Sequence, residues 1–263
     1  MSLLGPLGAA ARPLARVIGR AAAAQAREVA MMAALAAMAP LGRVGDSVER
    51  AIDALLPIAG HISPSARPVL LVHGFAGTKS CWFALARALR ERGITVDAIN
   101  YSVLGNSVEQ LADQLAARVD RLLAETGADK VHLIGHSLGG IVIAQAFADG
   151  RLDGQVDTVV TIATPFGGSP WANLCPLGAT VRALRHGSPL LCRLAEAPVP
   201  DGVRWLAITG ARDVIVPGRR SVPHHAEVQR VTVDDVGHVG MLLSPLVVAH
   251  IVDALPADER AVA

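Results

Sequence analysis

Short apolar runs alternate with longer amphipathic runs along most of this chain. Six runs rich in Val, Ile and Leu predict strands, at residues 69–72, 96–99, 131–134, 158–163, 205–209 and 228–233. Apolar residues at helical spacing predict helices between them at 80–92, 107–126 and 141–147, and a further helix after the last strand at 242–255. Alternating strands and helices favour right-handed crossovers. We therefore expect an α/β fold with a mostly parallel sheet of about six strands flanked by helices.

The clearest helix signal lies at 107–126. Ser107 and Gln110 match a capping box, in which each residue satisfies a backbone donor of the other. The apolar stripe that follows comprises Val108, Leu111, Leu115, Val119, Leu122 and Leu123. A further helix is expected at 47–56, where Ser47 is a suitable N-cap and Pro57 follows.

Residues 1–45 differ from the rest of the chain because they are rich in Ala and Arg. Their spacing predicts a helix with four arginines along one face: Arg12, Arg16, Arg20 and Arg27. Such a helix can make a peripheral contact with an anionic membrane; the alternative is a helix packed on the domain with its arginines in water. We expect a helical segment at 1–45 and one α/β domain at 46–263.

The apolar run 29–41 has only 13 residues and contains Pro40, so it is too short to cross a bilayer. The basic region before it is longer than a usual signal peptide allows. The sequence allows two alternatives for Cys175 and Cys192: a disulfide between them, or free thiols buried in the core. The expected compartment is the cytoplasm or the membrane periphery, with secretion or the cell envelope as the alternative.

Composition and charge narrow the class of protein. The 263 residues are 52% hydrophobic, which is enough to fill a sizeable core. The net charge is only +1, so no overall field attracts nucleic acid, and we expect no nucleic-acid partner.

The most informative motif is Gly-His-Ser-Leu-Gly at 135–139, between a strand pattern and a helix pattern. Ligands of parallel sheets bind at the carboxyl ends of the strands, where this motif lies. A sharp turn from strand to helix strains the residue at its apex, and glycines allow close approach of the neighbouring backbone. Ser137 is therefore the candidate nucleophile.

A serine nucleophile needs a base, and nine histidines compete for that role. His238 follows the last expected strand and is flanked by Gly237 and Gly240, so it is the preferred base. His136 adjoins the serine and is expected to point elsewhere. Asp213 follows the fifth strand, and the resulting chain order of Ser, Asp and His favours it as the orienting carboxylate over the nearer Asp234 and Asp235.

Acyl transfer also needs donors for an oxyanion. The glycine-bearing turn at 73–78 offers the Phe75 N–H, and the residue after the serine offers the Leu138 N–H.

These motifs, together with Thr161–Ser169 and Val236–Leu243, resemble the α/β-hydrolase superfamily and, within it, the small bacterial triacylglycerol lipases and their esterase relatives. The resemblance covers about residues 67–256. It implies that Ser137 is the nucleophile, His238 the general base and then acid, and Asp213 its orienting partner. It also implies that Phe75 and Leu138 supply the oxyanion donors.

Two departures from this family stand out. Full-size members open with an antiparallel strand pair, whereas residues 47–66 suggest a helix and a loop. The second is an insertion at about 169–200, between the fourth and fifth strands, which suggests a small helical cap; ordinary helix packing on the sheet is the alternative. The expected pocket or cap residues are Phe166, Trp171, Leu174 and Leu177.

The expected function is cleavage of lipid-like carboxylic esters through an acyl-enzyme on Ser137, with a small-molecule acyl ester as substrate. This chemistry requires no metal and no cofactor. An acyltransferase or thioesterase with the same triad is the alternative, and a non-catalytic binding protein of the same fold is a further one.

Overall fold

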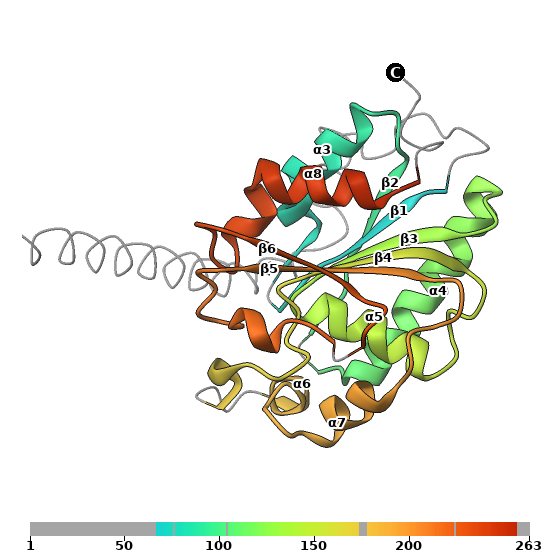
Figure 1. Ribbon diagram of the computed structural model, residues 1–263. Coiled ribbons are helices and arrows are strands. Elements are labelled where there is room, and N and C mark those ends of the chain that lie inside the picture. The colour runs from blue at the N-terminus through green and yellow to red at the C-terminus, as the bar shows by residue number, and fades with distance from the viewer. Residues whose placement is uncertain (1–66, 76, 104, 174–177, 224, 257–263) are drawn as a thin grey trace, which may run out of the picture.

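The computed structural model describes residues 67–256, apart from 76, 104, 174–177 and 224. These residues form one six-stranded, all-parallel sheet in the order β2-β1-β3-β4-β5-β6 (Figure 1). The strands are β1 (Val69–Val72), β2 (Val96–Ile99), β3 (Val131–His136), β4 (Val156–Ile162), β5 (Arg204–Gly210) and β6 (Gln229–Val233). The expected sheet is confirmed, and the expectations for residues 1–45 and 47–56, Leu174, Cys175 and Leu177 lie outside the described residues.

Strands β1 and β3 are neighbours in the interior of the sheet and are buried along their whole length. Continuous Val, Ile and Leu runs suit this position, because a parallel sheet is covered on both faces. Each predicted strand begins and ends within two residues of the observed one.

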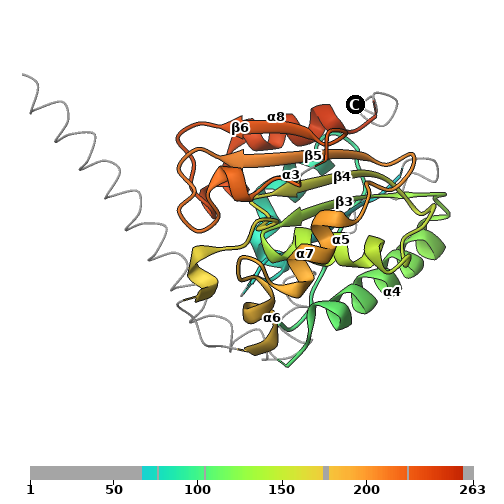
Figure 2. The ribbon, with the colours of Figure 1, turned by 60° about the horizontal axis from the view of Figure 1, so that its bottom comes forward.

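Helices cover both faces of the sheet (Figures 1 and 2). Helices α3 (Phe83–Arg90) and α8 (Pro245–Ala254) pack on one face, and α4 (Val108–Thr126) and α5 (Leu138–Ala148) pack on the other. Short 3-10 turns, η2 (Lys79–Trp82) and η5 (Gly240–Leu243), precede α3 and α8. Each face therefore has its own apolar core cluster.

The capping box at the start of α4 is present. The Gln110 N–H donates to Ser107 Oγ over 3.3 Å, and the Ser107 N–H donates to Gln110 Oε1 over 2.8 Å. Gly127 ends the helix with a φ of 71°, a conformation that favours glycine. Helix α5, in contrast, begins three residues before the predicted 141, because the elbow at Ser137 leads directly into it.

The insertion between β4 and β5 consists, where described, of η3 (Pro170–Asn173), α6 (Gly178–Ala183) and α7 (Pro189–Glu196). Its buried side chains join the same core cluster as α4 and α5; they are Ala172, Val181, Leu184, Leu190, Leu191 and Leu194. Thr180 Oγ1 donates to the Asn106 carbonyl over 2.6 Å and anchors α6 to the body of the domain. The apolar stripe of the insertion is thus used in packing. None of the described helices is long and apolar enough to cross a membrane.

Candidate active site

Ser137 stands alone between the end of β3 and the first residue of α5. Its backbone has φ 53° and ψ −120°, and its N–H donates to the Ile162 carbonyl on β4 over 2.8 Å. A positive φ in a residue with a side chain costs energy and persists only where the surrounding structure imposes it. The predicted strained elbow is therefore present at the carboxyl edge of the sheet.

Two glycines allow α5 to begin so close to the sheet. A Cβ on Gly139 would lie 2.1 Å from the Val72 carbonyl oxygen, and a Cβ on Gly140 would lie 2.0 Å from Thr164 Oγ1. A third glycine, Gly74, brings the turn after β1 against the serine, since its Cβ would lie 3.0 Å from Ser137 Cβ. The elbow and this turn could not adopt their present contact with larger residues.

Asp213 and His238 come from the loops after β5 and β6 and meet at the same edge of the sheet. Asp213 Oδ2 lies 2.8 Å from His238 Nδ1, and both residues are buried. The other carboxylate oxygen, Oδ1, accepts the N–H groups of Ile215 and Val216 over 2.9 and 2.8 Å. An ionised carboxylate only accepts, so Nδ1–H is the donor in this bond, and in the neutral imidazole this tautomer has its lone pair on Nε2.

The turn that contains Phe75 is held by a buried histidine and tyrosine. The Nδ1–H of His73 donates to the Gly74 carbonyl over 2.9 Å, and the Tyr101 ring stacks on the imidazole with centroids 4.2 Å apart. The Tyr101 hydroxyl donates to the His73 carbonyl. Burial lowers the pKa of His73 to about 4, so its ring is neutral at neutral pH.

Leu138 is the first residue of α5. The first N–H groups of a helix have no acceptor within the helix and are suited to bind an anion or a developing oxyanion. Phe75 lies in the turn that Gly74 holds against Ser137. The two expected oxyanion donors therefore belong to segments that adjoin the serine.

His136 corrects one expectation, because its side chain does not point away from the site. Its Nε2 lies 3.0 Å from the backbone carbonyl oxygen of His238, and the two imidazole centroids are 4.8 Å apart. The ring is buried, and burial lowers its pKa to about 3. No local sequence signal marks this contact, since 102 positions separate the two residues.

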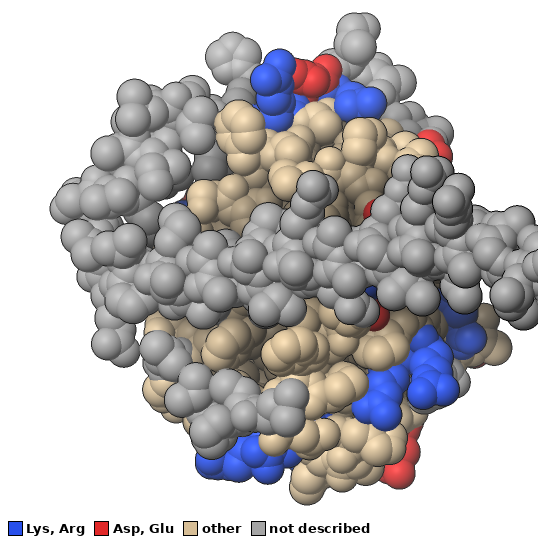
Figure 3. Space-filling view, turned by 90° about the vertical axis from the view of Figure 1, so that its left-hand side faces the viewer, with Lys and Arg blue, Asp and Glu red and all other residues tan. Residues whose placement is uncertain are grey.

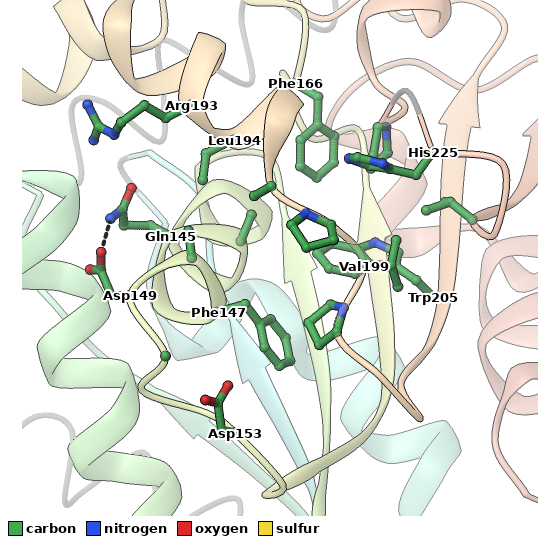
Figure 4. Close-up of a pocket in the computed structure, with 18 residues that line it drawn as sticks. Gln145, Phe147, Asp149, Asp153, Phe166, Arg193, Leu194, Val199, Trp205 and His225 are labelled. Carbon is green, nitrogen blue, oxygen red and sulfur yellow. Dashed lines mark hydrogen bonds between the residues drawn. The ribbon is translucent and has the colours of Figure 1, made fainter.

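The four expected pocket or cap residues do not share one environment in the structure. Phe166 is buried and lines a cavity of about 660 Å³, whereas Trp171 on η3 is 41% exposed. Phe147 and Trp205 line the same cavity, between α5, α7 and β5 (Figure 4). Neither Ser137 nor His238 lines it, so this cavity is separate from the site at the elbow. Leu174 and Leu177 lie outside the described residues.

Figure 3 shows the face of the molecule at the carboxyl ends of the strands. Its described surface is largely uncharged, and Lys and Arg are more evident there than Asp and Glu. Within residues 67–256 as described, no three His, Cys, Asp or Glu side chains gather into a group that could hold a metal ion. Cys192 on α7 is a free, exposed thiol.

Comparison with known proteins supports this architecture. Residues 67–177 match the family model described as the alpha/beta hydrolase fold. A mature Bacillus licheniformis lipase superimposes with a TM-score of 0.62 at 19% identity, over 70% of this chain and 89% of that one. A likeness at this identity shows the fold.

Two curated triacylglycerol lipases are similar in sequence. The one from Pseudarthrobacter phenanthrenivorans is 37% identical over 114 residues, which are 40% of this chain and 35% of that protein. The one from Burkholderia plantarii is 37% identical over 114 residues, which are 40% of this chain and 31% of that protein. This chain thus matches about a third of the length of these relatives. The six-stranded sheet and the family-model match over residues 67–177 give this part of the chain the α/β-hydrolase fold. Among the proteins with that fold, it resembles bacterial triacylglycerol lipases.

Proposed function

We propose that this chain hydrolyses carboxylic esters through an acyl-enzyme on Ser137. The proposal is supported by the strained serine at the end of β3 and by the buried Asp213–His238 pair on the loops after β5 and β6, because the carboxyl ends of these parallel strands share one edge of the sheet. A serine hydroxyl is a poor nucleophile until a base removes its proton. Asp213 fixes the imidazole in the tautomer that leaves Nε2 able to accept that proton.

In the proposed reaction, Ser137 Oγ attacks the ester carbonyl carbon while His238 Nε2 takes the hydroxyl proton. The N–H groups of Phe75 and Leu138 stabilise the oxyanion of the tetrahedral intermediate. His238 then gives its proton to the departing alkoxide, and the alcohol leaves an acyl-Ser137. Water repeats these steps with the same residues, which releases the carboxylic acid and restores the serine.

An uncharged, lipid-like acyl ester is the proposed substrate class. The described part of the face at the carboxyl ends of the strands is largely uncharged where it can be seen (Figure 3), and the net charge of the chain is only +1. The names of the curated relatives, triacylglycerol lipases from two bacteria, agree with this class.

Hydrolysis of nitrophenyl esters of increasing acyl length tests the proposal. The purified protein should be active, and Ser137→Ala should lose about 10³-fold or more in kcat. Ser80→Ala, which alters an exposed serine outside the site, is the matched control and should keep wild-type activity. Equal activity of Ser137→Ala and the wild type would end the proposal.

Two further measurements distinguish ester hydrolysis from a non-catalytic role and from acyl transfer. A fluorophosphonate probe should label the wild type and not Ser137→Ala; an unlabelled wild type would indicate a non-catalytic protein. Product analysis with added glycerol should give the free acid, whereas a dominant glycerol ester would assign the chain to acyl transfer.

A further inference from the structure

His136 links the nucleophile strand to the loop that carries the base. It is the last residue of β3, directly before Ser137, and its Nε2 reaches the backbone carbonyl of His238 over 3.0 Å. A carbonyl oxygen only accepts a hydrogen bond, so Nε2 must carry the proton. The ring is therefore a neutral donor to the main chain of His238.

Two backbone bonds join β6 and the loop after it to the loop that follows β5. The Ala211 N–H donates to the Val233 carbonyl over 2.9 Å, and the Arg212 N–H donates to the Val236 carbonyl over 3.2 Å. These bonds fix His238 relative to Asp213. The bond from His136 instead fixes His238 relative to β3, the strand that ends directly before Ser137.

The same imidazole also adjoins the turn expected to bind the oxyanion. A Cβ on Gly74 would lie 3.2 Å from His136 Nδ1, so the turn packs against this nitrogen. Trp82 meets the ring edge-on, with centroids 6.4 Å apart and planes at 90°. The ring is thus clamped in one orientation by three neighbours from separate segments.

We infer that His136 is a positioning residue, which sets the separation between His238 and Ser137 by donating its Nε2–H to the His238 carbonyl. The inference rests on the proposed function. A shift of about 1 Å between reacting groups costs roughly 10²-fold in rate, so the effect of losing this bond is measurable. The loss of rate should appear in kcat and not in KM, because His136 positions the base and does not contact the ester.

Three substitutions separate positioning from space filling. His136→Gln keeps an N–H donor at about the position of Nε2, His136→Leu keeps bulk without a donor, and His136→Asn is polar but too short to reach the carbonyl. We expect Leu and Asn to lower kcat by about 10²-fold with KM nearly unchanged, and Gln to recover most of the loss. His250→Gln on α8 is the control and should keep wild-type kinetics.

The outcomes distinguish this inference from the proposed function. If Ser137→Ala is inactive but His136→Leu and His136→Asn have wild-type kcat, positioning by His136 is wrong. Equal losses in the Gln and Asn variants would also overturn it, because space filling would then explain the effect. If the Leu variant does not fold, the comparison of Gln with Asn decides. Wild-type activity in Ser137→Ala would instead defeat the proposed function.

Discussion

Asp213 and His238 are joined by a hydrogen bond of 2.8 Å between Oδ2 and Nδ1, although 25 positions separate them in the sequence. The exposed fraction is 6% for Asp213 and 2% for His238. Two backbone N–H groups, from Ile215 and Val216, hold the carboxylate from its other side. These bonds fix the orientation of the carboxylate independently of the imidazole, and the carboxylate favours the proton on the ring nitrogen that faces it.

Asp213→Asn should remove most of the activity without removing the fold. A neutral amide that donates to Nδ1 would favour the wrong imidazole tautomer, and it cannot stabilise the imidazolium formed during attack. We expect kcat on a nitrophenyl ester to fall by about 10⁴-fold. Asp201→Asn is the matched control, since Asp201 is an exposed residue in the turn before β5, at the other end of that strand from Asp213. A wild-type kcat in Asp213→Asn would contradict the assigned role.

The sequence predicted the parts of the site that depend on strand ends. Val69–Val72 was expected residue for residue, because a run of buried apolar residues between polar segments has few alternatives. The contact between Asp213 and His238 could be anticipated because both follow strands whose carboxyl ends share one edge. Topology alone brings such residues together.

Contacts between side chains of distant segments could not be predicted from the sequence. His136 was expected to point elsewhere, since nothing near it in the chain marks the His238 carbonyl as its acceptor. The positive φ of Ala163 and the cavity beside Phe147 and Trp205 had no local signal either. Both depend on how whole elements pack, which a pattern of apolar positions does not specify.

Gly139→Ala should destabilise the fold. The added methyl would lie 2.1 Å from the Val72 carbonyl oxygen, and backbone on both sides leaves little freedom to relax. We expect a loss of about 1–3 kcal/mol or more in the free energy of unfolding, measured by urea titration. Gly218→Ala is the control, because the nearest atom to its Cβ would be 3.5 Å away. Equal midpoints of urea unfolding for the two variants would contradict this prediction, because they would show that the backbone at the elbow shifts to accommodate the methyl group.

Tyr101 should ionise only when the protein unfolds. It is the only tyrosine of the chain, so phenolate absorbance reports on one residue. Burial raises the pKa of its hydroxyl, with a smaller contribution from Cys81. The unfolded chain loses this proton near about pH 10, so stability falls as the pH rises beyond that value. We expect the phenolate band and the loss of circular dichroism to follow a single alkaline transition. A phenolate signal in the folded protein would refute the prediction.

His73 should make the fold sensitive to mild acid. Burial lowers its pKa from the ordinary 6.5 to about 4, so the unfolded chain binds a proton at a pH where the folded protein does not. Its contribution to stability is therefore complete above pH 6.5 and is lost as the pH falls from 6.5 towards 4. Linkage sets the largest slope at about 1.4 kcal/mol per pH unit for this one group.

His73→Asn tests this dependence, because the amide N–H of Asn can still donate to the Gly74 carbonyl without titrating. Urea unfolding of both proteins at several values between about pH 5 and pH 7.5 should give a flatter dependence in the variant. The pKa of His136 is also lowered, to about 3, mainly by burial, and His73 is only the smallest of the causes of this shift. The contribution of His136 is therefore largely shared by the two proteins, and the difference between the two slopes reports chiefly on His73. Parallel curves would show that this histidine stays unprotonated in the unfolded chain or titrates equally in both states.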